Sequence, residues 1–265
     1  MTDSKKNIVL KTDNLSIGYQ TKKQQTIIAS NINLSVEKGN FVALLGKNGI
    51  GKSTLLRTLS KVQEPLSGTI EINQKNSANY SFQELATKLS LVLTERIPQS
   101  QLTVFELIAL GRQPYTNWID QLSTKDLKKI LWAIEETAIS HLKDKKFYEL
   151  SDGQLQRVLI ARALAQDTEI IILDEPTAHL DIHHTFKVFS LLKKLVKNTG
   201  KTIIISTHEV NLAIQLADEF ILLSEKQIYS GTSKELINNN AFEQLFPKEL
   251  ISFNKTLEQF VIKKN

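Results

Sequence analysis

The sequence predicts an α/β fold, and three patterns lead to this prediction. Short apolar runs that suit buried strands, such as 41–45 and 170–173, alternate with helix-compatible segments. A glycine-rich turn, 46–51, joins the first of these runs to a helical segment. The pattern is helical from about 80 to 149, whereas 68–73 alternates as a strand does. We therefore expect a core of strands and helices, with a small antiparallel β-region and a helical insertion.

The composition is that of a globular protein. Hydrophobic residues make up 41% of the 265 residues and charged residues 23%, so a sizeable core is expected. The absence of cysteine fits a reducing compartment and excludes disulfides and thiolate metal sites. The first residues lack the apolar stretch of a secretory signal, and the apolar runs are too short to cross a bilayer. We therefore expect a soluble, cytoplasmic protein.

The net charge of +5 would suit nucleic acid or an anionic membrane surface. The lysines, however, are scattered along the chain rather than clustered. A solvated surface explains the charge better, and we expect no nucleic-acid partner.

Residues 8 to 45 indicate short strands that lead to the glycine-rich turn. The runs around 8–17 and 32–36 have the spacing of strands. Tyr19 lies in this region, where a single tyrosine is ordinarily half-buried packing.

The glycine-rich turn has the spacing G-x-x-x-x-G-K-S/T, from Gly46 to Ser53. Glycines let successive backbone N–H groups point at one anion, and the helix that follows directs its positive dipole end at the same point. Lys52 would then reach the β- and γ-phosphates, and the Ser53 hydroxyl would ligate Mg²⁺. The alternative is an ordinary turn between strand and helix, but strand, glycines, lysine and serine occur together here. The turn therefore predicts a nucleoside triphosphate site.

The segment from about 80 to 149 carries apolar residues at helical spacing, including Phe105 and Ile108. Within it, 112–118 is expected to form a loop with exposed aromatic side chains. Such aromatics suit partner contacts. The alternative is an insertion that only packs.

Residues 151–165 are expected to form a helix, because Ser151 and Gln154 have the spacing of a capping box. The next apolar strand ends in Asp174 and Glu175. Beside a phosphate loop, Asp174 would hold Mg²⁺ and Glu175 would polarise the attacking water. The alternative is a strand that simply ends in polar residues.

The last strands are expected at 202–206 and 220–223. His208 follows the first of them, at the end of the strand where open α/β sheets bind ligands. A lone histidine is more often structural, but this one has the position of a ligand. The residues after Gly231 carry no motif.

Together these motifs resemble those of the ATP-binding cassette (ABC) ATPase family. The resemblance rests on the phosphate loop, the segment LSDGQ at 150–154, the strand IIILDEPT and the triplet STH. It implies a RecA-like P-loop nucleotide-binding core with an antiparallel β-subdomain and a helical subdomain insertion. The ATPase domain would span 1–231, with the helical subdomain inserted at about 80–150. A C-terminal tail, 232–265, would pack on the core.

The resemblance also implies ATP and Mg²⁺ as cofactors and a role for each matching residue. Tyr19 would stack on adenine, and Asp174 would hold the metal together with Ser53. Glu175 would be the catalytic base, His208 the sensor of the γ-phosphate, and Asp181 a contact to a second subunit. The residues that match the phosphate loop are Gly46, Asn48, Gly49, Gly51, Lys52, Ser53 and Thr54, and those that match the family's signature motif are Ser151, Gly153 and Gln154.

In the family, the signature motif contacts the γ-phosphate bound by the opposite subunit. Two copies of the chain would therefore close head-to-tail on two ATP molecules, and hydrolysis would reopen them. The resemblance further implies transmembrane permease subunits as partners, a substrate-binding protein as an indirect partner, and a peripheral position at the cytoplasmic face of the inner membrane.

Two positions depart from the family's pattern. Asp152 stands where the signature motif usually has glycine, and a carboxylate near a γ-phosphate is unfavourable unless it points away. The family normally has a glutamine that senses Mg²⁺ after the strand 89–93; Thr94 or Glu95 would take that role here.

The segment 103–112, followed by Pro114, Tyr115 and Trp118, is similar to the importer ATPases for ferric siderophores, haem and cobalamin. The alternatives are a soluble ABC ATPase that acts on nucleic acid or the ribosome, and an exporter subunit. A single cassette without cysteine argues against the first, and the segment itself argues against the second.

Overall fold

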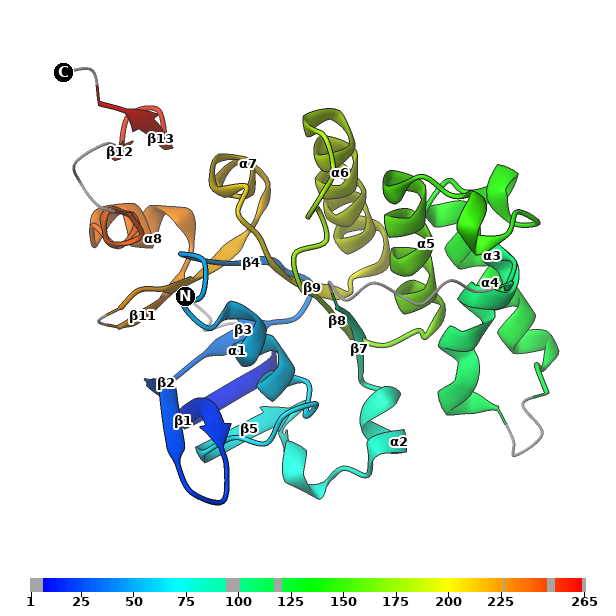
Figure 1. The fold of residues 1–265 in the computed structure, drawn as a ribbon, viewed down its shortest axis with the longest axis horizontal. Coiled ribbons are helices and arrows are strands. Elements are labelled where there is room, and N and C mark those ends of the chain that lie inside the picture. The colour runs from blue at the N-terminus through cyan, green and yellow to red at the C-terminus, as the bar shows by residue number, and fades with distance from the viewer. Residues whose placement is uncertain (1–6, 94–100, 117–120, 226, 247–250, 264–265) are drawn as a thin grey trace, which may run out of the picture.

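The computed structural model describes residues 7–93, 101–116, 121–225, 227–246 and 251–263. A six-stranded sheet forms its centre, with a layer of helices on one side and a second sheet on the other (Figure 1). The six strands are β4 (Phe41–Gly46), β7 (Leu89–Val92), β8 (Ile170–Leu173), β9 (Thr202–Ser206), β10 (Glu219–Leu223) and β11 (Ile228–Gly231). They follow the order β11-β10-β4-β9-β8-β7, and among them β11 alone is antiparallel to its neighbour.

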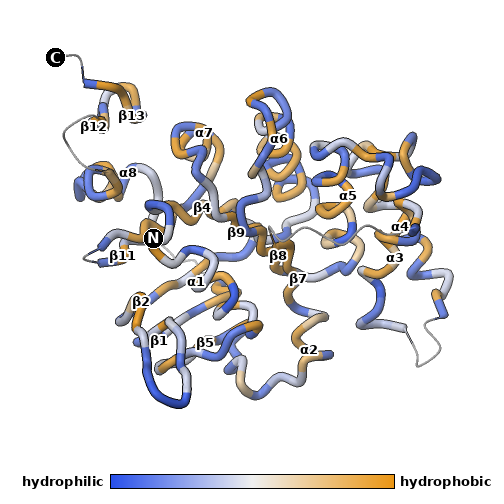
Figure 2. The backbone as a smooth tube through the Cα atoms, viewed as in Figure 1, coloured by the Kyte–Doolittle hydropathy of each residue, from blue (hydrophilic) through white to orange (hydrophobic). Residues whose placement is uncertain are grey.

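The strands β4, β8 and β9 are buried along their whole length, as parallel strands covered on both faces are. Successive residues of β4 point to opposite faces, so Phe41 belongs to one hydrophobic core and Val42 to the other. The first core includes residues of helices α5 (Asp152–Ala165) and α6 (Ile182–Thr199), and the second includes residues of α1 (Lys52–Leu59). Figure 2 shows hydrophobic residues concentrated along β8 and β9.

The predicted antiparallel β-region is confirmed. Its strands are β1 (Ile8–Gln20), β2 (Gln25–Ile32), β3 (Ser35–Glu37), β5 (Ser67–Ile72) and β6 (Lys75–Asn76). The long strand β1 pairs antiparallel with β2, β3 and β5. This second sheet covers the face of the central sheet that also carries α1.

The helical part of the chain follows β7. Its elements are α3 (Val104–Ala109), η2 (Leu110–Tyr115), α4 (Thr124–Glu136), η3 (Ser140–Leu142) and η4 (Phe147–Glu149). Helices α3 and α4 both pack against α5. The predicted insertion, about 80–150, also contains α2 (Phe82–Ala86) and β7, and β7 is the edge strand of the central sheet. The predicted insertion is therefore not wholly helical, because it includes a strand of the central sheet.

The tail contributes more structure than its lack of motifs indicates. It forms α8 (Ser233–Asn238), η5 (Phe242–Gln244) and a hairpin of β12 (Ile251–Asn254) and β13 (Gln259–Ile262). Phe242 is fully buried, and its ring stacks on that of Phe253 at 4.9 Å. On α7 (Val210–Leu216), the Asn211 amide accepts from Phe260 N–H at 2.8 Å and donates to its carbonyl at 3.1 Å. The hairpin is thereby attached to a helix of the core.

The expected loop at 112–118 is wrong for its first part, because Leu110–Tyr115 forms the 3₁₀ helix η2. Arg112 is buried: Nε donates to Asp126 Oδ1 at 2.8 Å and Nη1 donates to the Ala165 carbonyl at 2.7 Å. The ring of Tyr115 lies 4.0 Å from its guanidinium carbon. A buried charge needs such partners, and they draw the segment into a turn of helix. Trp118 lies outside the described residues.

Asp126 is the buried partner of Arg112 on α4. Burial raises the pKa of its carboxyl, but hydrogen bonds from Ser123 and Arg112 outweigh burial and leave the pKa below its ordinary value. The pair thus ties η2 to α4, and the contact with Ala165 ties both to α5.

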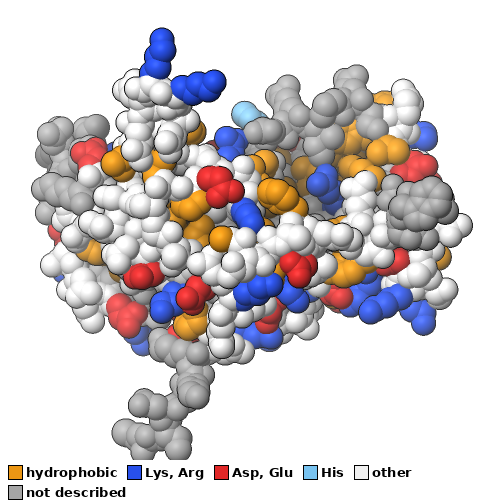
Figure 3. All heavy atoms as spheres, turned by 90° about the horizontal axis from the view of Figure 1, so that it is seen from below, with side chains coloured by type: hydrophobic (Ala, Val, Ile, Leu, Met, Phe, Trp, Pro, Cys, Tyr) orange, Lys and Arg blue, Asp and Glu red, His pale blue; other side chains and the backbone are white. Residues whose placement is uncertain are grey.

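Within the described ranges, every helix is too short or too polar to span a membrane. Figure 3 shows acidic and basic side chains interspersed on one face of the molecule, without a continuous basic area on that face. This distribution matches the scattered lysines of the sequence.

Arg112→Met should lower the free energy of unfolding by about 3–5 kcal/mol, because Asp126 would keep a buried charge without its partner. Chemical denaturation at neutral pH measures this. The matched control is Lys193→Met, whose exposed ion pair with Asp218 should contribute about 1 kcal/mol or less. Equal losses in the two variants would contradict the role assigned to Arg112.

Candidate active site

The phosphate-loop residues lie where β4 ends and α1 begins. Gly49 and Gly51 have φ angles of +75° and +111°, a region that favours glycine. A Cβ atom on Gly51 would approach Ile28 to 2.4 Å, so no side chain fits there. As far as the structure describes the chain, no side chain caps the first turn of α1. Its backbone N–H groups are therefore available to an anion.

Lys52 lies inside this loop with only 4% of its surface exposed. Its Nζ donates to the carbonyls of Gly46 at 3.1 Å and Lys47 at 3.2 Å. Burial lowers the pKa of Lys52, and the charges of Glu175 and Asp174 act in the opposite direction. The loop thus surrounds one ammonium group that is almost out of contact with water.

The other predicted residues of this loop differ in burial. Gly46 ends β4, Asn48 is exposed at the tip, and Ser53 is half-buried in the first turn of α1. The Thr54 hydroxyl lies 3.1 Å from the Tyr19 hydroxyl. Tyr19 is 51% exposed, so its ring stands at the surface beside the loop.

The two predicted carboxylates follow β8, which lies next to β9 in the sheet. Asp174 is 3% exposed and accepts a 2.6 Å hydrogen bond from the Ser206 hydroxyl. Glu175 Oε1 lies 3.8 Å from Lys52 Nζ and 2.5 Å from His208 Nε2. The structure therefore brings Lys52, Asp174, Glu175 and His208 into one cluster.

The backbone of Glu175 adopts a left-handed conformation, with φ at +46°. Such a conformation costs a residue with a side chain about 1–3 kcal/mol and is typical of functional sites. Its N–H donates to Ser206 Oγ at 2.8 Å, which helps to hold it. One buried hydroxyl thus binds both acidic residues, the first through its side chain and the second through its backbone.

Sequence reasoning missed Ser206. The triplet STH contains it, but a serine that ends an apolar strand has no distinctive pattern of its own. Its contacts with Asp174 and Glu175 depend on the neighbouring positions of β8 and β9, which the sequence does not display.

A second group of predicted residues lies elsewhere on the molecule. Ser151 is the N-cap of α5, and its expected capping box with Gln154 forms, with bonds of 3.1 and 3.3 Å. Asp181 is the N-cap of α6. Among the described residues, no hydrogen bond or ion pair joins Ser151, Gly153, Gln154 or Asp181 to the phosphate loop. One copy of the chain therefore carries two separate groups.

The two positions that depart from the family's pattern are Asp152 and the site of the usual glutamine after β7. Asp152 is exposed in the first turn of α5, where the helix dipole favours a negative charge. Thr94 and Glu95 lie outside the described residues, so the choice between them stays a prediction.

The donor set fits Mg²⁺. Asp174 offers a carboxylate and Ser53 a hydroxyl, and Mg²⁺ prefers a few oxygen ligands that it shares with water and phosphate. Among the described residues no cluster of three or more acidic or histidine side chains forms an all-protein metal cage.

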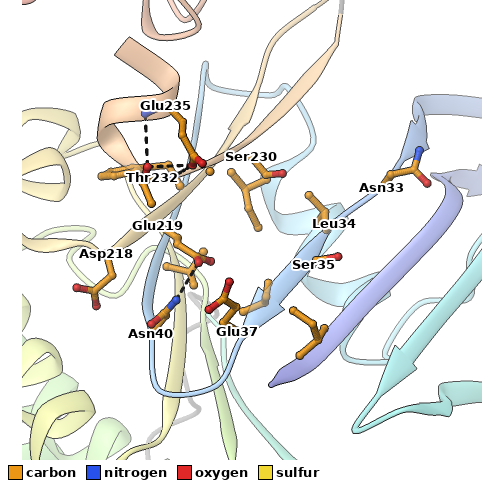
Figure 4. A pocket seen from close by; sticks show the side chains of 16 residues that line it. Asn33, Leu34, Ser35, Glu37, Asn40, Asp218, Glu219, Ser230, Thr232 and Glu235 are labelled. Atoms are coloured by element: carbon orange, nitrogen blue, oxygen red, sulfur yellow. Dashed lines mark hydrogen bonds between the residues drawn. The ribbon is translucent and has the colours of Figure 1, made fainter. Parts of the chain in front are cut away.

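Of two cavities in the described structure, one adjoins this site and the other lies at the opposite edge of the central sheet. A cavity of about 180 Å³ is lined by Glu175 and residues 177–180, which follow β8, and by residues 207–209, which follow β9. A larger one, of about 830 Å³, lies at the amino ends of β4 and β10, on the opposite edge of the sheet (Figure 4). There Asn40 donates to Glu219 at 2.9 Å. The carboxyl ends of the strands, where α/β sheets bind ligands, carry the smaller cavity.

The comparisons with known proteins agree with this geometry. Residues 29–178 match the ABC transporter family model. The chain is 34% identical to an uncharacterised ABC transporter ATP-binding protein of Methanocaldococcus jannaschii, over 97% of this chain and 88% of that one. It is 35% identical to the iron(3+)-hydroxamate import ATP-binding protein FhuC of Bacillus subtilis, over 89% of this chain and 87% of that one.

Solved structures of similar proteins cover most of the chain. A metal-chelate type ABC transporter in an inward-facing conformation superposes with a TM-score of 0.78 at 28% identity, over 96% of both chains. The ATP-binding cassette MJ0796, in a dimeric post-hydrolysis state bound to ADP and Pi, has a TM-score of 0.71 at 29% identity, over 84% of this chain and 98% of that one.

Ser206→Ala should lower the free energy of unfolding by about 1–3 kcal/mol, because a buried carboxylate and a backbone N–H would lose their shared partner. Chemical denaturation measures the change. Ser230→Ala removes an exposed hydroxyl and should change stability by about 0.5 kcal/mol or less. A Ser206→Ala variant as stable as the parent would contradict the assigned hydrogen bonds.

Proposed function

The chain belongs to the ABC transporter family, and we propose that it is the ATP-hydrolysing subunit of a bacterial importer for ferric siderophores or a related metal chelate. The convergence of Lys52, Asp174, Glu175 and His208 beside the phosphate loop carries the proposal of ATP hydrolysis. The proposed cargo is inferred from the names of two relatives. One is the iron(3+)-hydroxamate import ATP-binding protein of Bacillus subtilis, and the other is the ferric enterobactin transport ATP-binding protein of Escherichia coli, which is 34% identical to this chain.

The phosphates of ATP would be bound by the loop, with Lys52 facing the β- and γ-phosphates. Asp174 and Ser53 would hold Mg²⁺, whose charge offsets that of the phosphates. Tyr19 stands at the surface beside Thr54, a position that suits stacking on adenine. The phosphates would also be bound by the backbone of the loop. Its residues Gly46, Asn48, Gly49 and Gly51 would donate backbone N–H groups or let the backbone come close to the phosphates.

Glu175 is the proposed catalytic base. It would polarise the water that attacks the γ-phosphate. Its Oε1 atom lies near both His208 Nε2 and Lys52 Nζ, and these contacts direct the carboxylate. His208 would also contact the γ-phosphate, since it follows β9 at the same edge of the sheet. Ser206 acts through these residues, as it fixes the positions of both Asp174 and Glu175.

The second group of residues implies a second copy of the chain. Ser151, Gly153 and Gln154 begin a helix, where N–H groups bind phosphate. Within the part of the chain that the structure describes, they make no hydrogen bond to the phosphate loop of their own copy. A head-to-tail dimer would place them, with Asp181, against the ATP of the partner. The dimeric state of the MJ0796 cassette supports this arrangement. The exposed position of Asp152 lets its carboxylate turn away from that phosphate.

The remaining partners follow from the proposed import. The transmembrane permease would bind the cassette at the cytoplasmic face of the inner membrane, and a substrate-binding protein would act indirectly. The domain limits 1–231 and 232–265 are part of the same proposal, with the tail packed on the core through Phe242 and Asn211. We expect no nucleic-acid partner.

Glu175→Gln should bind ATP, hydrolyse it more slowly by about 100-fold or more, and accumulate as a dimer, because the general base is lost while the phosphate contacts remain. Light scattering with MgATP measures the dimer, and phosphate release measures the rate. The control is the same variant with ADP, which should stay monomeric. A monomer at saturating MgATP would contradict the composite site.

Lys52→Ala at the native locus should abolish uptake of one metal chelate, because hydrolysis would no longer drive the permease. Labelled ferric siderophores, haem and cobalamin are offered in parallel to cells grown under iron limitation. The control for damage to the fold is Lys47→Ala. Lys47 lies on the same loop as Lys52, and this change removes only its exposed ion pair with Glu225. Persistence of all three uptake activities in the Lys52→Ala cells, with the protein present and no second transporter, would exclude the import of these chelates.

A further inference from the structure

His184 lies between the two elements that carry the second group of site residues. It is in the first turn of α6, three residues after the N-cap Asp181. Its side chain is 45% exposed, so one side of the ring faces solvent. The other side is in contact with both Asp181 and the start of α5.

The contact with Asp181 is a double one. Asp181 Oδ1 accepts from the His184 backbone N–H at 2.8 Å, and Oδ2 lies 2.8 Å from His184 Nδ1. A carboxylate only accepts hydrogen bonds when ionised, so Nδ1 carries the hydrogen. These bonds from the His184 backbone and side chain lower the pKa of Asp181. A single residue therefore binds both oxygens of an exposed carboxylate and fixes its direction.

The contact with α5 explains why position 153 is a glycine. A Cβ atom on Gly153 would lie 2.7 Å from Cδ2 of the His184 ring and 3.2 Å from its Cγ. The ring thus fills the space that a side chain would need. Backbone strain does not explain the glycine, because Gly153 is helical and does not have a positive φ.

We propose that His184 is a positioning residue that fixes Asp181 and the start of α5 relative to each other, so that both reach the ATP of the partner copy together. This inference rests on the proposed head-to-tail dimer. Asp181 and Ser151 act on the same distant nucleotide in that dimer, but they are 30 positions apart in the chain. The His184 ring links the two directly: Nδ1 binds the Asp181 carboxylate, and Cδ2 and Cγ occupy the space beside Gly153.

The test measures ATP-dependent dimerisation in the Glu175→Gln background, where the closed dimer persists. His184→Ala removes both contacts. His184→Asn keeps a donor for Asp181 without the ring, and His184→Phe keeps a ring for Gly153 without the donor. His183→Ala is the matched control, because it removes an exposed imidazole one residue away.

We expect His184→Ala to raise the ATP concentration for half-maximal dimer by about tenfold, equivalent to the loss of one hydrogen bond to a charged group. His184→Asn and His184→Phe should fall between the parent and His184→Ala. ATP binding by the dilute monomer and its thermal unfolding should stay close to those of the parent, because the phosphate loop and the core are untouched. These two readouts separate positioning from a loss of folding.

A second set of variants tests the ring contact by itself. Gly153→Ala should impair dimerisation when His184 is present, because the added methyl group meets the ring. In the His184→Ala background the same change should add little, because the ring is gone.

Two results would overturn the inference. One is a His184→Ala variant that dimerises as well as His183→Ala. The other is a Gly153→Ala penalty that is equally large with and without the ring. A parent Glu175→Gln that never dimerises would instead contradict the proposed function, so the two failures are distinguishable.

Discussion

A buried ammonium group is the constraint on which the rest of this site depends. Lys52 is nearly excluded from water, and an isolated charge in such a place is strongly unfavourable. The carbonyls of the phosphate loop and the carboxylates after β8 compensate for it. They can do so because β4, β9 and β8 are adjacent and parallel, so their carboxyl ends meet at one edge. The strand order of the sheet is therefore the condition for charge balance in the site.

The same edge explains why polar residues near it are held so firmly. Ser206 is paired in register with Leu44 of β4, and its hydroxyl reaches across to the residues that follow β8. A hydroxyl that donates to one group and accepts from another couples their positions. The side chains around Lys52 are thus positioned by hydrogen bonds to the ends of the sheet strands, which favours a constant geometry.

The elements that sequence analysis predicted well are those with a local signal. The phosphate loop, the strand before Asp174 and the capping box of Ser151 each depend on residues a few positions apart, and each forms as expected. The missed features depend on contacts between distant segments. Arg112 finds its partners 14 and 53 residues away, and Ser206 finds Asp174 at a separation of 32. Sequence periodicity does not reveal such a distant neighbour, so the segment 112–118, with its proline and aromatic residues, is predicted as a loop.

The left-handed backbone at Glu175 has a consequence for the evolution and engineering of this protein. Glycine or asparagine would adopt that conformation with less strain, so selection for heat resistance alone favours their appearance at this position. Either replacement would delete the carboxylate that His208 and Lys52 direct. A variant that recovers this stability would therefore lose the carboxylate that we propose as the general base, so a selection for thermal stability has to keep residue 175 fixed.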